Sequence, residues 1–242
     1  EYRNKGIDVF ITAMNRVRTS GRLQNEAVVF IMVPAWVREP RADLQKALEL
    51  DYPIHERMQC PYITHWLNQM QDDRIINYIG NIGFRNSKSD KLKIIFIPCY
   101  LDGKDGILNK PYYDILIGMD VTVYPSYYEP WGYTPLESVA FGIPTITTNL
   151  AGFGLWAKKA CVSGDDIQEG VAVIERTDFN YFEVVDAITE QILKLSETDK
   201  NERKAIKERC FALAKKAEWS KFIAYYQDAF SIALANAAKR NC

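Results

Sequence analysis

The chain of 242 residues lacks long hydrophobic runs and lacks any marked excess of one charge. No apolar stretch approaches the roughly 18 residues that a membrane-spanning helix needs, so we expect no membrane span. The formal net charge is −1, which gives no indication of nucleic acid or an anionic membrane as a partner. The composition, 48% hydrophobic and 25% charged, is typical of a soluble α/β protein with a substantial core.

Cysteine and histidine are also scarce. The five cysteines are odd in number and lack metal-binding spacing; they stand at positions 60, 99, 161, 210 and 242. We therefore expect free thiols in a reducing cytosol, with no disulfide and no zinc site. The two histidines, His55 and His65, are expected to have structural roles in helices.

The N-terminal third begins with a helix and a strand. Apolar residues follow Lys5 and Gly6 at helical spacing, and a continuous apolar run over Ala27–Pro34 is typical of a buried parallel strand. A helix that leads into a parallel strand usually follows another strand, so we expect an earlier strand before Glu1. The start, Glu-Tyr-Arg-Asn-Lys, has no initiating Met and no signal-like segment. We therefore expect a fragment of a longer protein.

Residues 38–90 interrupt this alternation of helix and strand. Arg41–Leu50 has a helical pattern, and apolar positions between His55 and Phe84 recur at roughly helical spacing. Two interpretations remain open. The segment is either a helical excursion from an α/β core or a hairpin that packs on its own core.

The remaining sequence predicts strands that alternate with helices. The predicted strands are Lys91–Pro98, Asp120–Tyr124, Ile143–Thr148 and Gly170–Arg176, and a short helix covers Pro111–Gly118. Three helices follow over Tyr181–Leu195, Asp199–Ala217 and Trp219–Lys239. The fold class we predict is α/β, a Rossmann-like parallel sheet with helices on both faces and C-terminal helices at about 181–240. The loop at 100–110 has Asp-Gly pairs but lacks the ligand spacing of a calcium site.

The most informative stretch is Tyr124-Pro-Ser-Tyr-Tyr-Glu-Pro-Trp-Gly-Tyr-Thr-Pro-Leu-Glu137, which follows a predicted strand. Thr134 is the expected N-cap of a helix, Pro135 suits the first helical position, and Glu137 would complete a capping box. Gly142 is expected to end that helix. Open α/β sheets bind ligands at such a loop, beyond the carboxyl end of a strand.

The start of this predicted helix has the features of a phosphate site. Gly132 allows the backbone to approach a ligand closely. The amides of Gly132, Tyr133 and Thr134 lie at a helix N-terminus, where free N–H groups attract phosphate. Glu129 and Glu137 stand on either side of the turn and are candidates for contact with the sugar and with ribose hydroxyls.

Over 124–154 this run resembles the glycogen synthases of glycosyltransferase family 3. The resemblance rests on Tyr-Glu-Pro-Trp-Gly-Tyr-Thr-Pro-Leu-Glu and on Gly-Ile-Pro-Thr-Ile-Thr-Thr-Asn-Leu-Ala-Gly-Phe-Gly, and it extends more loosely from Glu1 to about Trp219. It implies that 1–242 is the nucleotide-sugar-binding domain of a GT-B enzyme, with an N-terminal domain elsewhere. Inserted helices near 38–90 make subunit contacts in this family, which implies a homo-oligomer.

The resemblance also assigns roles to charged residues. In GT-B enzymes a lysine and an arginine neutralise the donor's pyrophosphate, and the lysine corresponds to Lys5. The arginine would lie before Glu1. Glu129 would orient the donor glucose or stabilise positive charge at its anomeric carbon. No metal and no cofactor are implied.

Aromatic residues complete the implied site. Tyr112 corresponds to the position whose ring stacks on uracil, whereas its neighbour Tyr113 would point elsewhere. Glu137 would bind the ribose. Trp131 would either line the sugar pocket or pack beneath the loop.

The implied activity is retaining transfer of glucose from UDP-glucose to the 4-hydroxyl of an α-1,4-glucan. Two alternatives remain open. One is a related enzyme that uses ADP-glucose, and the other is a non-catalytic module that binds a nucleotide sugar or a glucan.

Overall fold

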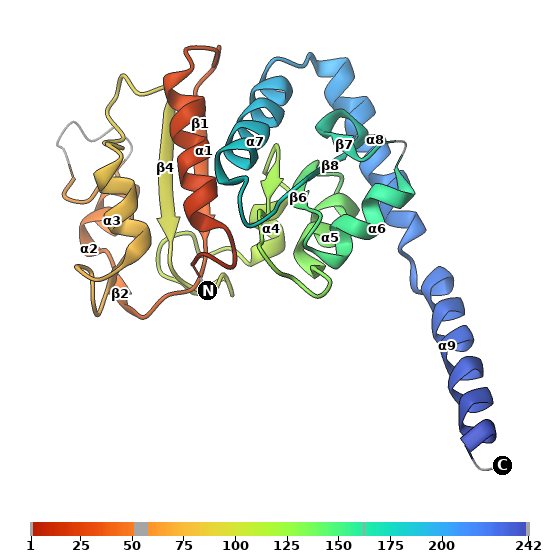
Figure 1. Ribbon diagram of the computed structural model, residues 1–242. Helices are drawn as coiled ribbons and strands as arrows, with labels where there is room; N and C mark the ends of the chain where they lie inside the picture. The colour runs from red at the N-terminus through yellow and green to blue at the C-terminus, as the bar shows by residue number, and fades with distance from the viewer. Residues whose placement is uncertain (1, 51–57, 162, 241–242) are drawn as a thin grey trace.

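The computed structural model describes residues 2–50, 58–161 and 163–240 (Figure 1). Its first half contains α1 (Ile7–Thr19), β1 (Ala27–Met32), β2 (Val37–Pro40), α2 (Ala42–Leu48), β3 (His65–Leu67), α3 (Arg74–Asn81) and β4 (Leu92–Ile97). Its second half contains α4 (Tyr112–Leu116), β5 (Thr122–Val123), α5 (Tyr133–Ala140), β6 (Thr145–Thr148), α6 (Gly152–Ala160), β7 (Asp165–Asp166), the 3₁₀ turn η1 (Ile167–Glu169), β8 (Val171–Ile174), α7 (Tyr181–Ser196), α8 (Lys200–Lys216) and α9 (Trp219–Arg240). Among the described residues, no helix has the length and apolar content to span a membrane.

The core strands are parallel, as the alternating pattern predicts. β1 pairs with β4, and β5, β6 and β8 form a second parallel group to which β7 adds an antiparallel edge. α1 packs against α7, whereas α5, α6 and α8 pack on one another, so helices cover both faces (Figure 1). The predicted α/β, Rossmann-like fold is confirmed.

The positions of the apolar side chains along the sequence explain most of this arrangement. Every residue of β6 and β8 is buried, as expected for parallel strands covered on both faces. The apolar stripe predicted for the first helix faces the core, with Ile7, Ile11 and Val17 buried. Gly142 has φ 76° and follows the last turn of α5, which confirms it as the residue that ends this helix.

The two parallel groups of strands are not hydrogen-bonded to each other in the described part of the chain. A cavity of about 1140 Å³ lies between them, lined by β1 on one side and by residues 118–126 on the other. The prediction that β1 is buried is therefore wrong for most of its length. Only Ile31 in β1 is buried, and Val28 is 51% exposed, because the free edge of the strand faces this cavity.

The segment 38–90 contains the helices α2 and α3, as the interpretation of a helical excursion expects, together with two short strands. β2 and β3 form an antiparallel pair, so helical structure is wrong for His65–Leu67. The segment does not have a core of its own, because Ile63 pairs with Phe96 of β4 and joins the main hydrophobic cluster. Short strands of this kind give too few residues for a period to be recognised.

The histidines and cysteines have structural surroundings. His65 is buried in β3, where its ring nitrogens lie 2.8 Å from the Thr64 hydroxyl and 2.8 Å from the Asp105 carbonyl oxygen. A structural role is confirmed, although in a strand instead of a helix. His55 lies outside the described residues. Four cysteines, at 60, 99, 161 and 210, are free thiols, and Cys242 lies outside the described residues.

The last helix, α9, extends away from the rest of the molecule (Figure 1). None of its side chains is fully buried, and Trp219, Tyr226 and Phe230 are at least half exposed. The predicted apolar stripe is therefore present, but it packs on the body only near its start, where Phe222 contacts Trp131.

A glycine joins the start of the chain to the motif loop. Gly6 is the N-cap of α1 and has φ 68°. A Cβ at this position would lie 1.9 Å from the carbonyl oxygen of Pro125. Only glycine permits both this backbone conformation and this close approach.

We predict that Gly6→Ala destabilises the chain far more than Gly21→Ala. Both glycines have positive φ, but a Cβ at Gly21 would meet no atom within 4 Å. We expect Gly21→Ala to cost about 1 kcal/mol of unfolding free energy from backbone strain alone. Gly6→Ala should cost roughly 3 kcal/mol or more, because steric displacement of the loop adds to the strain. Urea unfolding of both variants measures this, and equal losses would contradict the close packing at Gly6.

Candidate functional site

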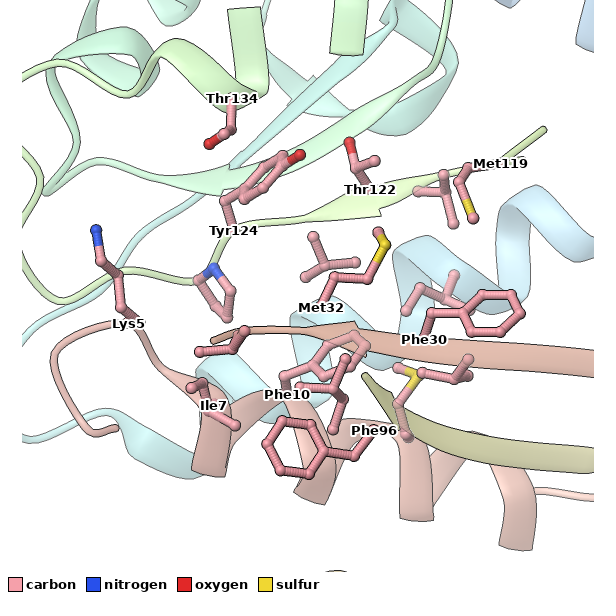
Figure 2. A pocket seen from close by; sticks show the side chains of 18 of the residues that line it. Lys5, Ile7, Phe10, Phe30, Met32, Phe96, Met119, Thr122, Tyr124 and Thr134 are labelled. Atoms are coloured by element: carbon pink, nitrogen blue, oxygen red, sulfur yellow. The ribbon is translucent and has the colours of Figure 1, made fainter. Parts of the chain in front are cut away.

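The motif loop, residues 125–132, runs from β5 to α5 at the edge of the cavity (Figure 2). The turn before α1 holds it on one side. The Tyr127 amide donates to the Asn4 carbonyl oxygen at 2.6 Å, and the Asn4 side-chain amide donates to the Tyr128 carbonyl oxygen at 3.3 Å. Together with the contact at Gly6, these bonds fix the turn that carries Lys5 beside the loop.

The start of α6 holds the loop on its other side. The Gly152 amide donates to the Glu129 carbonyl oxygen at 3.0 Å, and the Phe153 amide donates to the Trp131 carbonyl oxygen at 2.7 Å. A Cβ on Gly152 would lie 2.2 Å from the Pro130 carbonyl oxygen. The sequence shows a glycine turn at Ala151–Gly154, and the structure shows that its glycine lets two backbones meet.

A buried arginine supports the start of the loop. Arg176, which follows β8, is 8% exposed, and its Nη1 donates to the Pro125 carbonyl oxygen. Its guanidinium carbon lies 5.1 Å from the centre of the Tyr127 ring. Burial lowers the pKa of this guanidinium, although an arginine stays charged at neutral pH. Sequence reasoning missed Arg176, because no motif marks it.

Lys5 and Glu129 form an ion pair in the cavity. The Lys5 Nζ lies 2.5 Å from the Glu129 Oε2, and the side chains are 40% and 26% exposed. Both residues line the cavity, as do Gly132 and Thr134, and Figure 2 shows Lys5 reaching into the hollow below Thr134. The sequence assigned a role to each residue separately, and the structure brings the two together although 124 positions separate them.

The helix after the loop begins earlier than predicted. α5 starts at Tyr133, and its N-cap is Gly132, with φ 104° and no side-chain cap. The predicted capping box of Thr134 and Glu137 is therefore wrong, because the left-handed conformation at Gly132 already opens the helix. The amides of Gly132, Tyr133 and Thr134 donate to none of the described residues. The predicted group of free amides is present next to Lys5.

Two tyrosines of α4 lie near the start of α5. Tyr112 is half-buried and lines the cavity, and its hydroxyl lies 3.3 Å from that of Tyr124. Burial raises the pKa of Tyr112, and the nearby Tyr124 and Glu137 raise it further. Tyr113 donates to the Glu137 Oε1 at 2.9 Å, and this bond raises the pKa of the Tyr113 phenol. The link from Tyr113 to Glu137 was not predicted, because it joins two helices across the sequence.

Trp131 packs beneath the loop. Its ring centre lies 6.3 Å from that of Phe153, 6.1 Å from that of Trp156 and 5.6 Å from that of Phe222. Trp131 is not part of the cavity lining, so the structure favours the packing role over contact with the sugar. Tyr133 is 74% exposed and also lies outside the lining.

One group of potential metal ligands occurs in the described residues, away from this site. The side chains of His65, Cys99 and Asp105 place ligand atoms within 4.8 Å of one another. Both ring nitrogens of His65 are hydrogen-bonded, and the Asp105 carboxylate accepts from the backbone amides of 107, 108 and 109. Burial, with the Asp105 carboxylate, raises the pKa of Cys99 to about 11. His65 and Asp105 are therefore already engaged in holding the 100–110 loop.

Comparison with known proteins identifies the family of the chain. A family described as glycogen synthase matches residues 41–241. The glycogen [starch] synthase of Neurospora crassa is 25% identical over 98% of this chain and 41% of its own length. Isoform 2 of Saccharomyces cerevisiae is 35% identical over 62% of this chain and 21% of its own length. WaaG, a glycosyltransferase of lipopolysaccharide biosynthesis, aligns over 89% of this chain and 40% of its own, at 16% identity and a TM-score of 0.47.

The chain thus spans about two fifths of the length of the Neurospora relative. The family match covers most of the 242 residues, including the motif loop, α5 and the helices after β8. The protein belongs to the glycogen synthase family.

Proposed function

We propose that this chain supplies the donor-nucleotide half of a glycogen synthase active site. The reaction is retaining transfer of glucose from UDP-glucose to the 4-hydroxyl of an α-1,4-glucan. The observation that carries the proposal is the convergence of Lys5, Glu129 and the free amides of α5 on one cavity.

The leaving group of this reaction is a nucleoside diphosphate, so the main catalytic demand is to stabilise its developing negative charge. Lys5 and the amides of Gly132, Tyr133 and Thr134 supply positive charge where the diphosphate would lie. The amides are fixed at the start of α5, which avoids the cost of reorganising them during the reaction. They meet the demand without a metal or a cofactor.

The ion pair links the cation that would bind the diphosphate to the carboxylate that would face the sugar. Glu129 accepts from Lys5 across 2.5 Å. A bound diphosphate would compete for Lys5 with a larger charge, and Glu129 would then be released toward the donor glucose. There its carboxylate would orient the sugar or stabilise positive charge at the anomeric carbon.

The nucleoside would extend from the diphosphate toward α4. The ring of Tyr112 offers a face on which uracil can stack. Glu137 would accept hydrogen bonds from the ribose hydroxyls, and Tyr113 would hold its carboxylate in place through the bond at 2.9 Å.

The acceptor glucan and part of the donor sugar would be held by residues beyond this chain, in an N-terminal domain like that implied by the longer relatives. We propose that the 242 residues bind the nucleotide and do not transfer glucose alone. The complete protein would work in the cytosol, as a homo-oligomer.

We predict that Lys5→Ala weakens UDP binding by about 10-fold or more, because a charge-assisted hydrogen bond contributes about 1.5–3 kcal/mol. Binding of UMP, which has no second phosphate, should change much less. Titration calorimetry measures both. Lys88→Ala, in an exposed turn, is the matched control and should change neither affinity; equal effects of the two variants would refute the role of Lys5.

Glu129→Gln should have opposite effects on binding and on turnover. Loss of the carboxylate frees Lys5, so UDP should bind the 242-residue chain at least as tightly as before. In a longer, active form of the protein the same substitution should abolish glucose transfer. Retained turnover, or a large loss of UDP affinity, would contradict the assigned role of Glu129.

Glu137→Gln should weaken the binding of UDP by roughly 10-fold. 2′,3′-Dideoxy-UDP lacks the ribose hydroxyls, so it should bind the variant and the unsubstituted chain equally. Tyr113→Phe should give a smaller loss of UDP affinity.

Competition between UDP and ADP for the same chain tests which base the site prefers. If ADP bound as tightly as UDP, uracil would not be the preferred base and the ADP-glucose alternative would be favoured.

A further inference from the structure

Tyr124 is the first residue of the motif stretch, and the proposed function gives it no role. It directly follows β5, and its amide donates to the Ile146 carbonyl oxygen at 2.8 Å. Its side chain lines the cavity, and Figure 2 shows the ring between Thr134 and Thr122. The end of β5 therefore places a phenol in the same cavity as the proposed nucleotide site.

The Tyr124 hydroxyl lies in the middle of a chain of hydrogen bonds. It is 3.3 Å from the Tyr112 hydroxyl on one side and 3.1 Å from the Ser138 hydroxyl on the other. The Ser138 hydroxyl in turn lies 2.9 Å from the carbonyl oxygen of Thr134. The chain of bonds thus connects α4, the end of β5 and the first turn of α5.

The carbonyl at one end of this chain determines the direction of every bond in it. A carbonyl oxygen can only accept, so Ser138 donates its single hydroxyl proton to Thr134. The Ser138 oxygen can then only accept from Tyr124, and the Tyr124 oxygen accepts from Tyr112. Tyr112 is the first donor. It keeps its proton because burial, and next the neighbouring Tyr124, raises the pKa of its phenol.

This chain of bonds holds the ring of Tyr112 at its far end. Ser138 is fully buried, so the site that accepts from Tyr124 is closed to water, and hydrogen bonds that follow one another in a single direction strengthen each other. The Tyr112 ring is attached to α4 at one end and bonded through its hydroxyl at the other. Its face is therefore oriented before a ligand binds, which lowers the cost of ordering it on binding.

We propose that Tyr124 is a positioning residue of the nucleotide site, which holds the ring of Tyr112 in place for the base through its bonds to Tyr112 and Ser138. The inference rests on the proposed function, because it requires a base that stacks on Tyr112. If the chain of bonds only joined α4 to α5, its loss would lower stability without a selective effect on ligands that carry a base.

Tyr124→Phe removes the hydroxyl and keeps the ring. We expect it to weaken UDP binding by about 3- to 10-fold, the effect of losing a neutral hydrogen bond. The affinity for inorganic pyrophosphate, which has no base, should not change. Tyr78→Phe is the matched control, because it also removes a bond between two hydroxyls, to Thr12 at 2.7 Å, and Tyr78 is not part of the cavity lining. It should change neither affinity when both ligands are titrated by calorimetry.

A double-mutant cycle tests whether Tyr124 acts through Tyr112. Tyr112→Phe keeps the stacking ring and removes the same bond from its other end, so it should weaken UDP binding to a similar extent. The double variant should bind UDP little more weakly than either single variant, because one bond is lost in all three. The inference is overturned if the two losses multiply in the double variant, or if Tyr124→Phe weakens pyrophosphate as much as UDP.

Lys5→Ala, measured in the same series, separates this inference from the proposed function. If Lys5→Ala weakens UDP binding and Tyr124→Phe does not, the nucleotide site stands and only the role of Tyr124 is wrong. If the unsubstituted chain binds no UDP, both proposals are wrong.

Discussion

The contact between Gly6 and the Pro125 carbonyl is the constraint on which the site depends. It joins the turn before α1 to the motif loop, two segments separated by more than a hundred residues in the sequence. Because a side chain at this position would push the loop away, glycine permits the hydrogen bonds between Asn4 and the loop and the approach of Lys5 to Glu129. Without this contact the cation and the carboxylate would not share a cavity.

The loop itself is held from three directions: by the turn at residues 2–6, by the guanidinium of Arg176 and by the start of α6. Each support bonds to the backbone of the loop, and the turn at residues 2–6 also holds the Glu129 side chain through Lys5. The free amides of α5 are therefore fixed in direction before any ligand binds. Fixed dipoles stabilise developing charge better than groups that must reorient.

Much of this arrangement could be predicted from sequence, where the signal is local. The period of α1, the apolar runs of β4, β6 and β8 and the glycine after α5 each lie in one segment. Predictions were wrong where the structure depends on contacts between distant residues or on backbone conformation. The conformation of Gly132 replaced the expected cap at Thr134, and the exposure of β1 depends on what stands beside it in the sheet. The bond from Tyr113 to Glu137 likewise depends on how two helices meet.

The packing of Trp131 has a consequence for observing the site. Its indole lies among Phe153, Trp156 and Phe222, while its backbone belongs to the same loop as Glu129. Any displacement of that loop changes the surroundings of the indole ring. The chain has five tryptophans, so a variant in which Phe replaces the other four would let the emission of Trp131 report loop movement without a label.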